Sequence, residues 1–278
     1  MRLAVFDEYR IGVVRDEGVV DVSYAVPDHT GRWPWREVLT LLADLPRLRP
    51  ALEAAAREGT PRPLASVRLR APVPLPGKVI AAPVNYRPRQ FEMNVEAAPT
   101  SQGVYLKAPS SVIGAGDAIV LPFADRRVDY EGELAVVIGR EARRVPVERA
   151  LEYVAGYTGC FDITLRGRES AATRKSFDTF TPLGPWLVTA DEIGDPAELT
   201  LRVYVNEELR QRASAHEMLL SVPELIAWVS RLMTLYPGDV LATGTPPGVG
   251  PLHPGDRLAL EIAGVGRLEL PVHGPEAA

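Results

Sequence analysis

A row of alternating carboxylates that runs into an apolar segment, VDYEGELAVVIGR at residues 128–140, strongly constrains how this chain folds. The second half is β-branched, apolar and bounded by Gly139, which indicates a strand. Alternation along a strand places Asp129, Glu131 and Glu133 on one face, with successive same-face Cα atoms about 7 Å apart. Like charges this close repel one another unless a positive group lies between them. The face is therefore either open to water or holds a cation.

A third acidic residue could complete a cation site. Asp162, in AGYTGCFDITLRGRE, follows another expected strand. A set of carboxylate oxygens suits hard cations such as Mg²⁺, Mn²⁺ or Ca²⁺. Zinc does not suit the sequence, because no Cys/His pair has ligand spacing and the histidines are scattered at His29, His216, His253 and His273. On residue types alone, a solvated acidic face is the better interpretation.

Length and charge narrow the class of protein. A chain of 278 residues suits one large domain, or a large domain with a small one. The net charge of −5 argues against nucleic acid and anionic membranes as partners. The single cysteine, Cys160, excludes an internal disulfide and fits a reducing compartment. No apolar run approaches the roughly 18 residues that span a bilayer, and no signal peptide is visible, so we expect a soluble cytoplasmic protein.

The pattern of elements predicts a mainly β protein. Short strand patterns fill the first 23 residues and return beyond residue 79. We expect two short helices over 35–59, broken by Pro46 and Pro50. Further helices are expected over 146–154 and 221–233, the latter with Ser221 as its cap.

Two irregular segments divide the chain. The Pro-rich stretch 70–79 reads as a connection between a small N-terminal domain, residues 1–71, and a larger domain, residues 72–278. The polar stretch 85–103 lacks clear periodicity, and a loop of that length is typical of a lid or binding loop.

Two other motifs each allow a functional and a structural interpretation. The Gly-rich segment LATGTPPGVG, residues 241–250, is either a tight turn or a loop that holds an anion with backbone N–H groups and the hydroxyls of Thr243 and Thr245. Lys175, in RKSFDTFTPLGPWLV, lies beside apolar residues. A partly desolvated lysine can bind a carboxylate or transfer a proton, although a surface lysine with a buried stem is commoner.

Four stretches in this order resemble the fumarylacetoacetate hydrolase superfamily: VDYEGELAVVIGR, VAGYTGCFDITLRGRE, RKSFDTFTPLGPWLVT and TLYPGDVLATGTPPGVG. The segment KVIAAPVNYRPRQFE resembles it less closely, and the likeness covers residues 72–272. The resemblance implies a mainly β, α+β fold: a mixed β-roll catalytic domain behind a small N-terminal β/α domain. It also implies a homodimer.

The resemblance assigns site residues by motif position. Glu131 and Glu133 match the two metal-ligating glutamates of the family, and Asp162 matches the aspartate that completes the set for Mg²⁺, or for Mn²⁺ or Ca²⁺. Lys175 matches the lysine that faces the oxo-acid group of the substrate. The remaining expected substrate-binding residues are Tyr86, Arg89, Arg166, Thr245 and Glu169, the last standing where many members carry Gln.

The resemblance also implies a chemistry. The family acts on 2-oxo acids, their enols and β-diketo acids, by C–C hydrolysis, decarboxylation, tautomerisation or hydration. In each case the metal acts as a Lewis acid and stabilises an enolate. We therefore expect a metal-dependent hydrolase or lyase that cleaves a C–C bond in such an acid. The alternatives are an isomerase or hydratase of unsaturated 2-oxo acids, a relative recruited to specialised biosynthesis, or a catalytically silent binding protein.

One departure from the family pattern concerns the lid. Hydrolytic members carry N-Y-x-x-H-x-x-E, and here Asn85, Tyr86 and Glu92 are in place while Arg89 occupies the histidine position. Arginine stays protonated and cannot act as a general base, which leaves Glu92 as the candidate catalytic base. Arg89 could instead clamp a second carboxylate, and Pro88 would disturb a helical lid. We expect a poor acylpyruvate hydrolase.

Overall fold

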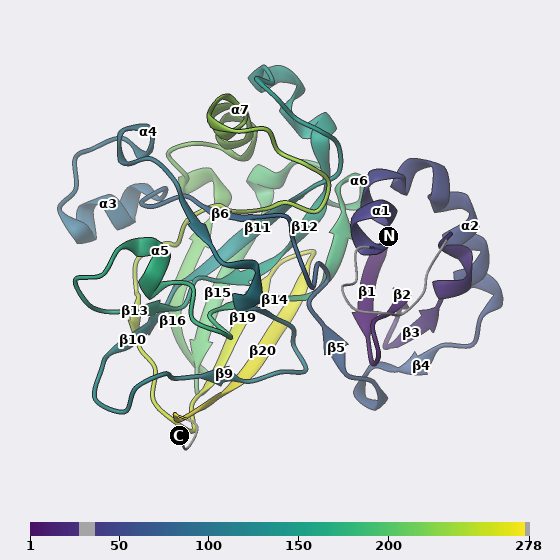
Figure 1. The fold of residues 1–278 in the computed structure, drawn as a ribbon, viewed down its shortest axis with the longest axis horizontal. Helices are drawn as coiled ribbons and strands as arrows, with labels where there is room; N and C mark the ends of the chain where they lie inside the picture. The colour runs from purple at the N-terminus through teal and green to yellow at the C-terminus, as the bar shows by residue number, and fades with distance from the viewer. Residues whose placement is uncertain (28–36, 276–278) are drawn as a thin grey trace.

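The computed structural model describes residues 1–27 and 37–275 and is organised around one large sheet (Figure 1). His29 lies outside the described residues. Along the sheet the strands follow the order β4 (Arg62–Pro63), β3 (Gly18–Asp21), β2 (Arg10–Arg15), β1 (Arg2–Phe6), β14 (Thr181–Thr189), β12 (Val154–Phe161), β11 (Gly132–Ile138), β17 (Val240–Ala242), β6 (Val79–Ala81) and β7 (Tyr105–Lys107). Two more strands attach at the side: β5 (Leu69–Arg70) pairs with β1, and β8 (Val112–Ile113) pairs with β14.

Two smaller sheets complete the β structure. One has the order β16 (Glu208–Ser214), β15 (Thr200–Val205), β19 (Arg257–Ile262), β20 (Gly266–His273) and β9 (Ile119–Val120). The other has the order β13 (Thr164–Leu165), β10 (Val128–Tyr130) and β18 (Gly250–Pro251). The expected mainly β, α+β fold is confirmed.

The apolar run that follows Glu133 is continuous because both faces of β11 are covered. Leu134, Val136 and Ile138 belong to a core shared with β19, β20 and helix α7. Ala135 and Val137 point to the opposite face and join a second core with the N-terminal strands and helices. A strand buried on both sides needs apolar residues at every position, so the alternation stops where this burial begins.

The helices are short apart from two. They are α1 (Glu37–Ala43), α2 (Leu45–Glu58), α3 (Arg87–Met93), α4 (Pro99–Gln102), α5 (Ala171–Arg174), α6 (Ala190–Ile193) and α7 (Val222–Leu232). The start of α7 is confirmed at Ser221, whose N–H and hydroxyl both donate to the Glu224 carboxylate, at 2.8 and 2.6 Å. The helix expected over 146–154 is a 3₁₀ helix, Val147–Tyr153. No helix in the described part of the chain is long and apolar enough to cross a membrane.

Two helices form in this region, but the prediction that Pro46 and Pro50 break them was wrong. The break between α1 and α2 falls at Asp44. Pro46 lies in the first turn of α2. Backbone N–H groups in that turn have no partner within the helix, so a proline there costs no hydrogen bond. Pro50 lies inside α2, and the buried Leu48 and Leu52 around it show that packing outweighs the lost hydrogen bond.

The lid segment 85–103 contains α3 and α4 rather than a continuous loop. Pro88 does not disturb α3, against our expectation, because it stands in the first turn of that helix. Asn85 anchors the start of the segment: its amide donates to the carbonyls of Thr243 and Leu220, at 2.9 and 3.0 Å.

The N-terminal region extends the central sheet. Strand β1 pairs antiparallel with β14, with Arg2 opposite Val188 and Leu3 opposite Leu187. The core beneath also joins α2 to β11 and β17. Sheet and core both run across the expected boundary between residues 71 and 72, and the division into two domains stays a prediction.

Candidate active site

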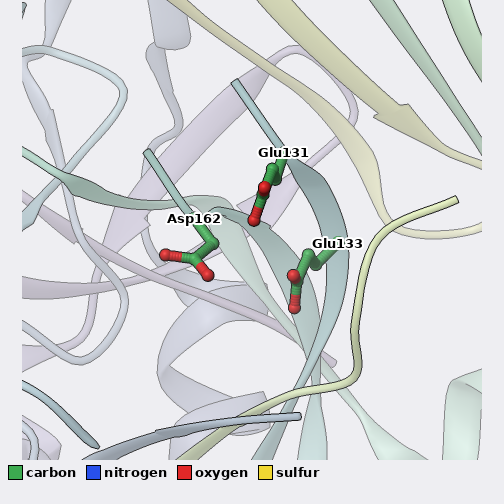
Figure 2. Close-up of side chains that lie close together, drawn as sticks. All are labelled: Glu131, Glu133 and Asp162. Atoms are coloured by element: carbon green, nitrogen blue, oxygen red, sulfur yellow. The ribbon is translucent and has the colours of Figure 1, made fainter. Parts of the chain in front are cut away.

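Three carboxylates meet at the ends of neighbouring strands (Figure 2). Glu131 links β10 to β11, Glu133 lies in β11, and Asp162 follows β12 directly. One oxygen from each lies within 4.8 Å of the others, and their exposed fractions are 7%, 1% and 0%. The Asp162 N–H donates to the Glu131 carbonyl at 2.8 Å, which fixes the two strand ends together. Burial excludes the solvated acidic face as the interpretation of this group.

Asp129 does not join this group, so the expected single face of three carboxylates was wrong. The chain leaves β10 at Tyr130 and enters a different sheet at Gly132, which interrupts the alternation. The Asp129 carboxylate accepts hydrogen bonds from Arg127 Nε and Arg166 Nε, both at 2.6 Å.

Two buried lysines and a tyrosine surround Asp162. Lys175 Nζ lies 2.6 Å from Asp162 Oδ2 and 2.8 Å from Glu131 Oε2, and it also donates to the Thr164 hydroxyl at 2.6 Å. Lys107 Nζ lies 2.5 Å from Asp162 Oδ1. The Tyr105 hydroxyl donates to Asp162 Oδ2. Lys175 is therefore buried against the acidic cluster. This excludes the alternative that it is a surface lysine with only its stem buried.

The charges of the cluster do not balance. Burial alone would raise the pKa of Asp162, but Lys107 and Lys175 outweigh burial and bring that pKa below its ordinary value. Burial raises the pKa of Glu133 well above its ordinary value, and the charges of Asp162 and Glu131 raise it further. Burial lowers the pKa of Lys175, but Asp162 and Glu131 reverse the effect, so its ammonium keeps the proton. Glu133 is the carboxylate with too little positive charge beside it.

This arrangement fits a hard divalent cation. The ligand set is made only of carboxylate oxygens, which suits Mg²⁺ or Mn²⁺. The uncompensated charge of Glu133 is what a cation among Glu131, Glu133 and Asp162 would neutralise.

A cavity of about 450 Å³ opens beside the cluster. Charged and polar side chains from distant parts of the chain line it, among them Arg89, Tyr105, Glu131, Arg166, Lys175 and Thr245. Arg166 is held in place by Asp129 and by Glu131, whose Oε1 lies 3.1 Å from its Nη2. The cavity therefore connects the acidic cluster with the lid.

The Gly-rich loop after β17 is both a tight turn and an anion contact. Gly244 has a φ of 96°, and a Cβ there would lie 2.8 Å from the Cβ of Asn85. Its N–H donates to Glu133 Oε2 at 2.8 Å, so the anion it holds is the protein's own carboxylate. The Thr245 hydroxyl donates to the Gly132 carbonyl at 2.9 Å, which ties the loop to β11.

The lid lines the cavity with Arg89, whose ion-pair partner Glu92 is exposed and does not line it. Arg89 is buried and pairs with Glu92 one turn along α3. The second oxygen of Glu92 accepts a hydrogen bond from the N–H of Gly248 at 3.2 Å. The lid arginine and the candidate base are thus bound to each other.

Two expected substrate-binding residues lie elsewhere. Tyr86 is fully buried, and its hydroxyl has no hydrogen-bond partner within residues 1–27 and 37–275. Burial raises its pKa. Glu169 is exposed and pairs with Arg126 at 2.8 Å. Neither residue lines the cavity.

The sequence reasoning missed three residues of the site. Tyr105 and Lys107 stand two positions apart in a short strand, a spacing that places both on one face and could have been noticed. Gln211 gave no signal: its amide donates to Thr245 Oγ1 at 2.9 Å and to the Pro246 carbonyl at 2.7 Å. Its oxygen accepts from the Gly132 N–H at 3.0 Å.

Comparison with known proteins gives consistent results. Residues 78–273 match the family model described as fumarylacetoacetate (FAA) hydrolase C-terminal. A maleylpyruvate hydrolase of Aquipseudomonas alcaligenes is 42% identical, over 98% of this chain and 99% of the relative. A mitochondrial oxaloacetate tautomerase of Rattus norvegicus is 41% identical, over 73% of this chain and 69% of the relative.

Among solved structures, a maleylpyruvate hydrolase from a Sphingobium strain has been crystallised with manganese(II) and pyruvate. It superimposes with a TM-score of 0.91 at 41% identity, over 99% of this chain and all of that chain. The likeness therefore includes the N-terminal region as well as the segment matched by the family model.

Proposed function

The chain belongs to the fumarylacetoacetate hydrolase family, and from that premise we propose that it hydrolyses a C–C bond of an acylpyruvate with the help of a divalent cation. In this reaction water adds to the C4 carbonyl, the C3–C4 bond breaks, and C3 takes up a proton. The products are a carboxylic acid and pyruvate. The observation that carries the proposal is the buried carboxylate cluster beside a cavity that Arg89 also lines, with the exposed Glu92 paired to that arginine.

The proposed roles follow the geometry of the cavity. Glu131, Glu133 and Asp162 would hold Mg²⁺ or Mn²⁺, which supplies Lewis acidity at the 2-oxo group. Lys175 keeps its proton and turns one of its three N–H donors from Glu131, Asp162 or Thr164 to the oxo-acid end of the substrate. Glu92 accepts the proton of the attacking water on the oxygen held by the Gly248 N–H, once the lid brings it to the cavity, while Arg89 stays paired with its other oxygen.

The substrate-binding assignments have unequal support. Arg89, Arg166 and Thr245 line the cavity, which supports their proposed contacts with the substrate. Tyr86 and Glu169 do not line it, so a substrate contact for either requires the lid or the α5 segment to move. A homodimer and a cytoplasmic location remain predictions.

The expectation of a poor hydrolase and the likeness to maleylpyruvate hydrolases point in opposite directions. The likeness covers nearly the whole chain, which favours hydrolysis. The engagement of Glu92 by Arg89 and by Gly248 favours the second candidate, a tautomerase of 2-oxo acids, because proton transfer needs no activated water.

The test is product analysis with Mn²⁺ and three substrates: maleylpyruvate, acetylpyruvate and oxaloacetate. We expect pyruvate and the matching carboxylic acid from the first two. Glu92→Gln should lower that hydrolysis by about 10²–10⁴-fold, the usual contribution of a general base. Enol–keto exchange of oxaloacetate without release of pyruvate from any acylpyruvate would favour the tautomerase instead.

The lid arginine can be tested in the same assay. If the missing histidine limits water activation, Arg89→His should raise acetylpyruvate hydrolysis. A fall in hydrolysis would show that Arg89 itself serves the reaction.

A further inference from the structure

The cationic side chains around the cavity differ in how far their charge is already compensated. Arg89 pairs with Glu92, Arg166 pairs with Asp129 and Glu131, and Lys175 pairs with Glu131 and Asp162. Arg174 lines the same cavity. In the part of the chain that the structure describes, its guanidinium has neither an ion pair nor a hydrogen bond. Among the cationic side chains that line the cavity, Arg174 is therefore the one without an ion pair in the described residues, although its charge helps, after a backbone hydrogen bond and Arg126, to lower the pKa of the exposed Glu169.

The position of Arg174 is set by the same short helix that delivers Lys175. Helix α5 begins at Ser170, whose hydroxyl accepts the N–H of Thr173 at 3.3 Å, and ends where the Lys175 N–H donates to Ala171 O at 3.1 Å. Lys175 then reaches into the acidic cluster, while half-buried Arg174 borders the cavity. Figure 1 shows α5 next to α3, and both helices contribute to the cavity wall.

We propose that Arg174 binds a second carboxylate at the end of the substrate away from the 2-oxo acid group. The inference rests on the proposed function and narrows it to dicarboxylic acylpyruvates. The 2-oxo acid end is accounted for by Lys175 and the acidic cluster. A guanidinium presents a planar fork of donors that matches a carboxylate, and a half-buried site strengthens the pairing.

Arg174 suits this role better than Arg89. Arg89 would have to leave Glu92, and Glu92 would then lose the partner of its charge. Arg174 gains an ion pair without breaking one. An arginine whose only role was to cover apolar surface with its side-chain stem could lie anywhere on the protein, whereas Arg174 lines the cavity.

The experiment compares two unreactive ligands of equal length, 2-oxoadipate and 2-oxohexanoate, which differ in the distal carboxylate. Calorimetry is performed on the Mn²⁺-loaded protein at fixed ionic strength. We expect the unaltered protein to bind 2-oxoadipate about tenfold more tightly, a difference of about 1.4 kcal/mol. Arg174→Gln should abolish this preference and leave the affinity for 2-oxohexanoate unchanged, and Arg174→Lys should retain part of it.

Arg168→Gln is the matched control, because Arg168 is an exposed arginine of the same segment that does not line the cavity. Equal binding of the two ligands by the unaltered protein would overturn the proposal, as would a preference that survives Arg174→Gln. Because the assay measures binding, its failure is separate from a failure of the hydrolysis assay: a protein that releases pyruvate from acetylpyruvate but ignores the distal carboxylate would retain the proposed function and lose this inference.

Discussion

The cavity borders two regions that are built in different ways: the acidic cluster, here called the inner end, and the helices α3 and α5, here called the outer end. At the inner end, Glu133 and Asp162 lie in or directly after the long paired strands β11 and β12. At the outer end, Arg89 and Arg174 lie on helices of seven and four residues. The inner carboxylates are almost fully buried, whereas Phe91 of α3 leaves 78% of its surface exposed.

This difference separates the chemistry from the choice of substrate. The pairing of β11 with β12 fixes the positions of the inner carboxylates relative to one another. A cation site requires ligands held in such fixed positions. The exposed lid helix α3 can shift with little loss of packing, so its residues can change without disturbing the inner end, whereas α5 is tied to that end through Lys175. The departure at Arg89 lies at the outer end, and the intact acidic cluster lies at the inner end.

The largest effect is expected where the inner end loses a ligand. Glu133→Gln should weaken Mn²⁺ binding and lower turnover at least about 100-fold, since even indirect partners of a metal contribute 10–100-fold. The melting temperature without metal should not fall, because the change removes a charge that its neighbours repel. Calorimetry and thermal unfolding measure both effects, with Glu152→Gln on the surface as control. Unchanged Mn²⁺ affinity would refute the ligand assignment.

The next effect concerns the buried cation beside Asp162. Lys107→Met should destabilise the metal-free protein by about 3–5 kcal/mol, because Asp162 keeps its charge and loses one of its partners. That corresponds to a melting temperature roughly 6–20 °C lower. Adding Asp162→Asn to Lys107→Met should recover part of the loss. If the single variant melts within 2 °C of the unaltered protein, about the effect of 1 kcal/mol or less, Lys107 does not balance the cluster.

The smallest effect is expected at the outer end. Pro88→Ala should change stability by no more than about 0.5 kcal/mol, since the first turn of α3 needs no hydrogen bond from residue 88. Turnover should also stay the same. A large gain in hydrolysis in Pro88→Ala would mean that proline does restrict the lid, and would make the outer end the limiting part of the site.

The sequence predicted the inner end well because its signals are local. Glu131 and Glu133 stand two residues apart in one segment, and the structure brings their carboxylates together even though Glu131 lies between two strands. Asp129 misled the same reasoning, because nothing in VDYEGELAVVIGR shows that the chain changes sheets at Glu131. Pro88 misled it as well, because its effect depends on where α3 begins.

Long-range contacts account for what could not be predicted. Lys107 meets Asp162 across 55 positions, and Gln211 meets Thr245 across 34. Only the pairing of strands in space brings such residues together. The pairing of Arg89 with Glu92 is local and could have been anticipated from their spacing of three on a helix.

The pairing of β1 with β14 has a consequence for cooperativity. A continuous ladder of hydrogen bonds leads from the N-terminal strands through β14 and β12 to β11, which carries Glu133. Opening β1 would expose an edge of the sheet that holds the acidic cluster, and we therefore expect the two regions to unfold together rather than as independent units. We expect free energy gained by binding at the cluster to be shared along the ladder, so that occupancy of the site slows amide hydrogen exchange in strands that never touch the ligand.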